Sequence, residues 1–152
     1  MTQRLNPFTA TPDGVAALVA VENYLKTSGL DHRLLALVKT RVSQINGCAY
    51  CLHMHTEEAR KLGETPTRLY LLNAWHESNL YSERERAALA WAESLTNIST
   101  THAPDEVYEQ ARRQFNEEAL ADLSIAIAMI NAWNRLSIGM RAAHPADMAK
   151  AA

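Results

Sequence analysis

Two cysteines and a histidine lie close together in the sequence and are the residues best suited to chemistry. Cys48 and Cys51 are the only cysteines of the chain, and His55 follows four residues after the second of them. In a helix, which turns by about 100° per residue, Cys51 and His55 lie within about 60° of Cys48 around the axis. The three side chains are therefore expected on one face, whereas His53 points well away from it. This spacing places two thiols beside one imidazole.

These residue types predict redox chemistry. The reactive form of a cysteine is its thiolate, and a position at the start of a helix, just after Asn46-Gly47, favours that form. His55 stands four residues after Cys51 and can take or share its proton. Peroxide oxidises a thiolate to a sulfenic acid, which condenses with a neighbouring thiol to a disulfide that an external dithiol can reduce. The pattern is that of a thiol peroxidase.

Other interpretations of the cysteine pair stay open. Cysteines in a helical core are often small buried hydrophobic residues without chemistry. A purely structural disulfide is disfavoured, because a four-residue loop restricts the unfolded chain little and the cytosol is reducing. Zinc is a further alternative, with Cys48, Cys51, His53 and His55 as ligands, although structural zinc sites usually draw on two separated segments. Attachment of a c-type haem is excluded, because Leu52 stands where that motif needs a histidine.

The elements that must position these residues are predicted to be helices. The chain of 152 residues contains 25 Ala and 18 Leu, which favour helices, against 12 Val plus Ile and 5 Gly. We predict an all-α fold, a compact bundle of about six to seven helices, in a single domain over residues 1–152. The helical segments are residues 12–28, 31–46 and 48–62, a short piece after Pro66, one segment starting after Ser82, one starting near Pro104, and residues 117–142.

Local signals mark several of the helix ends. Asp31 is a good N-terminal cap, Thr11 can cap the first segment, and Ser82 and Glu85 have the spacing of a capping box. Asn46-Gly47 marks a break between the second and third segments. The last segment is nearly apolar in its middle, so it is expected to be buried on most sides or to lie in a subunit interface.

Composition argues against several classes of partner. Lys plus Arg total 15 against 17 for Asp plus Glu, a formal net charge of −2, so nucleic acid is not an expected partner. The longest apolar stretch, Leu123–Trp133, is too short to span a bilayer. The start of the chain lacks the apolar core of a secretory signal, and we therefore expect a cytoplasmic protein that acts without a membrane.

The run from Leu37 to Thr56 resembles the alkylhydroperoxidase D-like (AhpD-like) branch of the carboxymuconolactone decarboxylase family. Its string Ser-Gln-Ile-Asn-Gly-Cys-x-x-Cys-x-x-x-His, residues 43–55, is highly specific. Residues 68–72, 83–91 and 130–135 also look like members of this branch, so the likeness covers most of the chain. It implies an AhpD-like all-helical fold and a homo-oligomer, either a trimer or a hexamer built as a trimer of dimers.

The resemblance also implies roles for the three residues. By analogy with family members that are peroxidases, Cys51 attacks the peroxide, Cys48 resolves the product to a disulfide, and His55 belongs to a proton relay that activates Cys51. The substrate is then a hydroperoxide. The reductant is a dithiol, which in better-known members is of the lipoyl type on a partner protein. Neither a cofactor nor a metal is expected.

The sequence departs from the family pattern at one position of the relay. A glutamate usually lies twelve residues before the first cysteine, where this chain has Ala36. A carboxylate orients the histidine, so its absence is expected to slow proton transfer, unless Glu22, Glu57 or Glu58 takes its place in space. We therefore expect a thiol-dependent (alkyl)hydroperoxidase of low or moderate activity in antioxidant defence. The alternatives are a redox-sensing or disulfide-exchange protein with little turnover, and a helical scaffold or zinc protein without activity.

Overall fold

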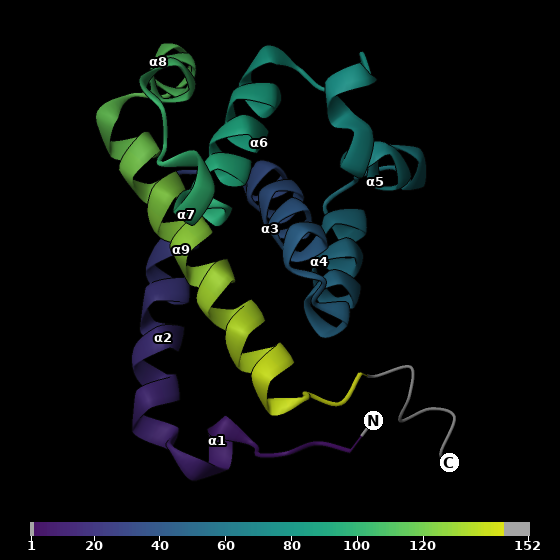
Figure 1. Ribbon diagram of the computed structural model, residues 1–152, viewed down its shortest axis with the longest axis vertical. Coiled ribbons are helices and arrows are strands. Elements are labelled where there is room, and N and C mark those ends of the chain that lie inside the picture. The colour runs from purple at the N-terminus through teal and green to yellow at the C-terminus, as the bar shows by residue number, and fades with distance from the viewer. Residues whose placement is uncertain (1, 145–152) are drawn as a thin grey trace.

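The computed structural model describes residues 2–144 of the chain (Figure 1). Within that range every regular element is a helix, which confirms the all-α prediction. The described residues form nine α-helices and one 3-10 helix: α1 (Pro7–Ala10), α2 (Pro12–Leu25), α3 (His32–Asn46), α4 (Ala49–Lys61), α5 (Pro66–Leu71), η1 (Leu72–Glu77), α6 (Glu83–Thr96), α7 (Ile98–Thr101), α8 (Asp105–Gln114) and α9 (Glu117–Met140).

The seven predicted segments correspond to α2, α3, α4, α5, α6, α8 and α9. The piece predicted after Pro66 continues from α5 into η1. The sequence did not predict α1 or α7, because elements of four residues are too short to display an apolar period. Thr11 occupies the predicted N-cap position of α2, but its side chain makes no capping hydrogen bond there. Its backbone N–H closes α1 instead.

Side-chain caps fix the start of several long helices. The carboxylate of Asp31 accepts a hydrogen bond from the N–H of Leu34 at 2.9 Å and so begins α3. Ser82 and Glu85 form both bonds of the predicted capping box at the start of α6. The side-chain oxygen of Asn116 accepts a hydrogen bond from the N–H of Ala119 and so caps α9. These caps satisfy amides that would otherwise lack a partner, and they set where each helix begins.

The turn between α3 and α4 ends one helix and starts the next within two residues. Gly47 has φ +69°, in the left-handed region that favours glycine, and the N–H of Cys48 donates to the carbonyl of Ser43 at 3.0 Å. This is the bonding pattern of a Schellman motif. The chain therefore leaves α3 abruptly, and Cys48 becomes the N-cap of α4.

Two helices, α3 and α9, occupy the middle of the bundle. Helix α3 packs against α4, α6 and α9, while α9 also contacts α2, α6 and α8. The side chains that these helices direct inward are fully buried, among them Leu37 and Val38 of α3 and Leu123 and Ile127 of α9. Figure 1 shows α2 beside the C-terminal half of α9, at the edge of the bundle. Among residues 2–144, no helix combines the length and hydropathy needed to cross a membrane.

The capping box of α6 gives a direct test of this account of the helix ends. We expect Ser82→Ala to lower the free energy of unfolding by about 1 kcal/mol, because the N–H of Glu85 loses its acceptor. Ser99 is exposed within α7, so Ser99→Ala is a matched control that should change stability by less than about 0.5 kcal/mol. Urea unfolding measures both. Equal losses in the two variants would contradict the cap.

Candidate active site

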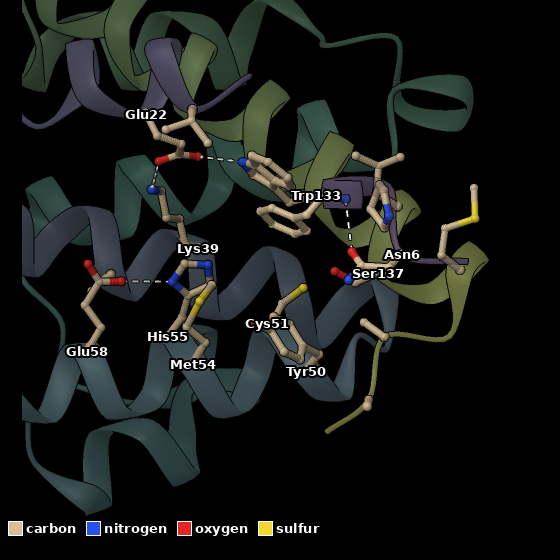
Figure 2. A pocket seen from close by; sticks show the side chains of 18 of the residues that line it. Asn6, Glu22, Lys39, Tyr50, Cys51, Met54, His55, Glu58, Trp133 and Ser137 are labelled. Atoms are coloured by element: carbon tan, nitrogen blue, oxygen red, sulfur yellow. Dashed lines mark hydrogen bonds and ion pairs between the residues drawn. The ribbon is translucent and has the colours of Figure 1, made fainter. Parts of the chain in front are cut away.

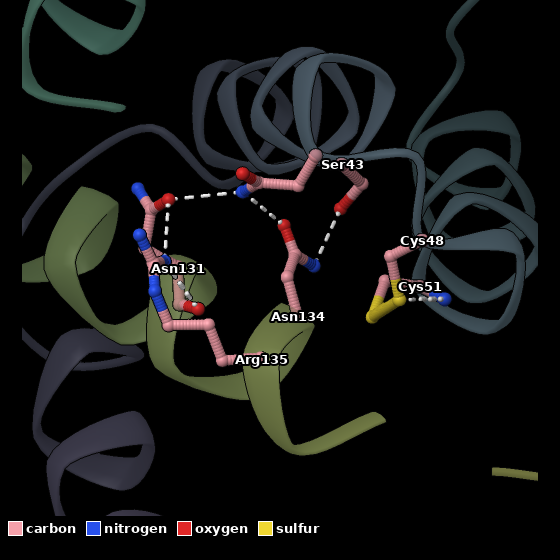
Figure 3. Close-up of a disulfide and its surroundings, with 7 residues drawn as sticks. Ser43, Cys48, Cys51, Asn131, Asn134 and Arg135 are labelled. Carbon is pink, nitrogen blue, oxygen red and sulfur yellow. Dashed lines mark hydrogen bonds between the residues drawn. A yellow bond between two sulfur atoms is a disulfide. The ribbon is translucent and has the colours of Figure 1, made fainter. Parts of the chain in front are cut away.

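The two cysteines lie at the first turn of α4 and are joined by a disulfide (Figure 3). Their Cα atoms are 5.4 Å apart, and both residues are only 1% exposed. The N–H of Cys51 donates to the sulfur of Cys48 at 3.3 Å, so the N-cap sulfur lies at the positive end of the helix. The structure thus brings the predicted pair together in a position that favours thiolates once the disulfide is reduced.

A buried group of amides ties this turn to α9 (Figure 3). The amide nitrogen of Asn46 donates to the side-chain oxygens of Asn131 at 2.9 Å and of Asn134 at 2.8 Å. Asn134, which is fully buried, donates in turn to the hydroxyl of Ser43 at 3.2 Å. These bonds connect the last turn of α3 with the central helix. They hold in place the backbone from which Cys48 extends.

His55 lies two turns beyond Cys48 on α4 and is 5% exposed. Its Nδ1 atom is 3.0 Å from Oε2 of Glu58 (Figure 2). The hydrogen bond with His55 holds the pKa of Glu58 below its ordinary value, and partial burial, which raises that pKa, is the smaller effect. Glu58 is therefore ionised at neutral pH and accepts the proton of Nδ1. The Nε2 atom is left as the ring nitrogen that can accept another proton.

Of the three glutamates considered from the sequence, Glu58 is the one that contacts His55. Glu57 is exposed, and Glu22 bonds to other side chains. Ala36 is 1% exposed and lies at the edge of the same cavity as His55. Position 36 thus provides no carboxylate to His55. Glu58, which lies one turn after His55 on α4, provides one.

A cavity of about 580 Å³ lies among α1, α2, α3, α4 and α9. Cys51 and His55 contribute to its wall, whereas Cys48 does not. Much of the remaining lining is apolar, including Phe8, Leu35, Met54, Trp133, Leu136 and Met140. The ring of Phe8 stacks on Trp133 with centroids 6.4 Å apart. A ligand in this cavity would approach Cys51, with His55 in the same wall.

Two further polar contacts in this cavity were not foreseen from the sequence. The ammonium of Lys39 lies 2.7 Å from Oε2 of Glu22, and the indole N–H of Trp133 donates to Oε1 of Glu22 at 3.1 Å. The three residues come from α3, α2 and α9, and no local spacing in the sequence predicts such a contact. Trp133 packs against the main apolar core, and it also forms part of the cavity wall and donates to a partly buried carboxylate.

The structure separates His53 from the other side chains of the zinc alternative. His53 is exposed, and its ring lies edge-on to that of His144 with centroids 4.8 Å apart. Of the other histidines, His32 contributes to the cavity, and its Nε2 lies 3.0 Å from the carbonyl of Lys26. His76 is exposed beside Glu93. The cavity therefore contains one buried imidazole close to the cysteine pair, that of His55.

The chain belongs to the carboxymuconolactone decarboxylase family, whose sequence profile matches residues 12–94. It is 44% identical over 140 residues to the YdfG protein of Bacillus subtilis (strain 168), an alignment that spans 92% of this chain and 95% of YdfG. The resemblance based on the cysteine motif is thus confirmed at the level of the family.

Solved structures share the fold. ATU0492 from Agrobacterium tumefaciens, a protein of unknown function suggested to be an AhpD-type antioxidant defence protein, superposes with a TM-score of 0.92 and 42% identity. That match covers 95% of this chain and 99% of the other. The debrominase Bmp8 superposes with a TM-score of 0.81 at 24% identity over 91% of this chain and 75% of its own. The second match supports the fold alone, and a shared fold does not identify a reaction.

The lowered pKa of Glu58 makes a prediction about stability and pH. A carboxylate with a lowered pKa stabilises the folded protein above its ordinary value of 4.5, and this contribution is lost as the pH falls through the lower value. We expect Glu58→Gln to reduce the free energy of unfolding at pH 7 by at most about 1 kcal/mol, because Glu58 is half exposed.

Urea unfolding at neutral pH and near pH 3 checks this expectation. The difference between the wild type and Glu58→Gln should shrink at the lower pH. Glu57→Gln removes a neighbouring exposed carboxylate and serves as the control, with little difference expected at either pH. A difference for Glu58→Gln that grows as the pH falls would contradict the assigned contact.

Proposed function

We propose that this protein is a thiol-dependent hydroperoxidase in which Cys51 is oxidised by the peroxide and Cys48 resolves the product. The observation that carries the proposal is that Cys51 and His55 share the wall of a large cavity, while Cys48 lies within disulfide distance behind Cys51. Membership of the family and the likeness to ATU0492 add support. The identification of Cys51 as the attacking residue also accords with the resemblance.

The first step oxidises one sulfur and reduces one peroxide. Nε2 of His55 takes the proton of the Cys51 thiol, and the Glu58 carboxylate stabilises the imidazolium that forms. The Cys51 thiolate attacks the terminal oxygen of the hydroperoxide, so that an S–O bond forms and the O–O bond breaks. The terminal oxygen keeps its hydrogen, giving a sulfenic acid on Cys51. The alkoxide that leaves takes the proton from His55 and becomes an alcohol.

The second step closes the disulfide, and a third reopens it. The Cys48 sulfur attacks the sulfenic sulfur of Cys51, forming the S–S bond and releasing water. An external dithiol then reduces the disulfide by exchange and becomes a disulfide itself. A dithiol of the lipoyl type on a partner protein is the reductant we expect from the resemblance.

The rate of this reaction is expected to be low or moderate. The carboxylate that the family usually places at position 36 is absent, and Glu58 is half exposed, so it orients His55 from a more solvated position. We also propose a homo-oligomer in the cytoplasm. Exposed apolar side chains on α2 and α9, including Val19 and Ile138, support a subunit interface there.

Turnover by cysteine variants tests the proposed function. With excess dithiol, Cys51→Ser should abolish peroxide consumption, because the attacking sulfur is gone. Cys48→Ser should still be oxidised once but should not form the disulfide within the chain. Steady-state consumption of tert-butyl hydroperoxide measures turnover. Turnover retained in Cys51→Ser would refute the assignment, and oxidation of wild-type thiols without turnover would indicate the redox-sensing alternative.

Two histidines two residues apart provide a matched test of the proton relay. His55→Gln should slow the oxidation of Cys51 by about 100-fold, because the base next to the thiol is lost. His53→Gln changes an exposed ring on the same helix and should leave the rate within about twofold of the wild type. Single-turnover loss of free thiols measures both rates. Similar rates in the two variants would exclude His55 as the base.

A further inference from the structure

The cavity contains a cation that the steps above do not use. The side chain of Lys39 is 12% exposed and extends from α3 into the cavity that Cys51 and His55 also line. Figure 2 shows Lys39 reaching between Glu22 and His55, with Cys51 further along the same helix as His55. A largely buried ammonium in a mostly apolar cavity acts on charge more strongly than one in water.

Glu22 holds this ammonium in one place. One oxygen of Glu22 accepts from Lys39 at 2.7 Å, and the other accepts from the indole of Trp133 at 3.1 Å. The carboxylate is therefore fixed between α3 and α9, and it fixes Lys39 in turn. An ammonium has three N–H donors, and the bond to Glu22 uses one of them. The others are available to a ligand in the cavity.

The reaction creates a negative charge that needs such a donor. When the O–O bond breaks, the oxygen that leaves carries the charge that the thiolate brought, until it is protonated. His55 lies in the cavity wall as the proton source, but it transfers its proton only as the charge develops. A donor already directed into the cavity stabilises the transition state without reorganisation. The charge of Lys39 also contributes to lowering the pKa of Glu58, the partner of His55.

We propose that Lys39 is a catalytic residue that donates a hydrogen bond to the leaving oxygen of the hydroperoxide. This inference rests on the proposed function. Lys39 keeps its proton throughout, the thiolate supplies the electron pair, and His55 supplies the proton that converts the leaving alkoxide into the alcohol. Glu22 is a positioning residue, because it acts through Lys39.

Two peroxides with different leaving groups separate this role from a structural one. tert-Butyl hydroperoxide releases a strongly basic alkoxide, whereas peracetic acid releases acetate, which needs little stabilisation. Lys39→Met should slow the oxidation of reduced protein by tert-butyl hydroperoxide about 10- to 100-fold. The rate with peracetic acid should fall by less than about threefold. Single-turnover loss of free thiols measures both rates without any reductant.

Arg41→Met is the matched control. It removes an equally buried cation of α3, which pairs with Glu93 outside the cavity, so the ratio of the two rates should stay within about threefold of the wild type. Lys39→Arg keeps a cation and should retain most of the wild-type ratio, and circular dichroism checks that each variant folds.

Each other result has a definite meaning. Equal slowing of both peroxides by Lys39→Met, or the same change of ratio in Arg41→Met, would overturn the role of Lys39 while leaving the proposed function intact. Wild-type thiols that neither peroxide oxidises would instead overturn the proposed function, and this inference with it.

Discussion

The candidate site depends on the turn between α3 and α4. Gly47 takes the left-handed conformation that ends α3, and because the chain turns there, Cys48 becomes the first residue of a new helix. Continued helix through this point would place Cys48 in a helix interior, where the amides are already bonded. Asn46 secures the turn from the other side through its bonds to Asn131 and Asn134 of α9. A local backbone conformation and a long-range polar contact thus create the positive helix end at which the cysteine pair lies.

Features set by neighbours in sequence could be predicted, and features set by contacts between helices could not. The break at Gly47, the caps at Asp31 and Ser82 and the seven longer helices follow from local rules, and the structure confirms them. The sequence could name three candidate acids for His55 but could not choose Glu58. That choice depends on side-chain direction within α4, since Glu58 is three residues from His55 and Glu57 only two.

The contents of the cavity lie beyond any local rule. Glu22, Lys39 and Trp133 are separated by up to 111 residues and meet because three helices pack around one space. Two pairs of ionisable groups line this space, Lys39 with Glu22 and His55 with Glu58, and such pairing lowers the cost of partly burying a charge. The likeness to the debrominase Bmp8, at 24% identity, shows the fold alone and does not identify a reaction. The reaction must be argued from these side chains.

The central claim is that the cysteine pair is a redox centre open to peroxide through the Cys51 side of the cavity. The most direct test adds one equivalent of tert-butyl hydroperoxide to the fully reduced wild-type protein and follows intact mass and free thiols with time. The account predicts rapid loss of both thiols and of two hydrogens within one chain. Survival of both thiols in excess peroxide would contradict it.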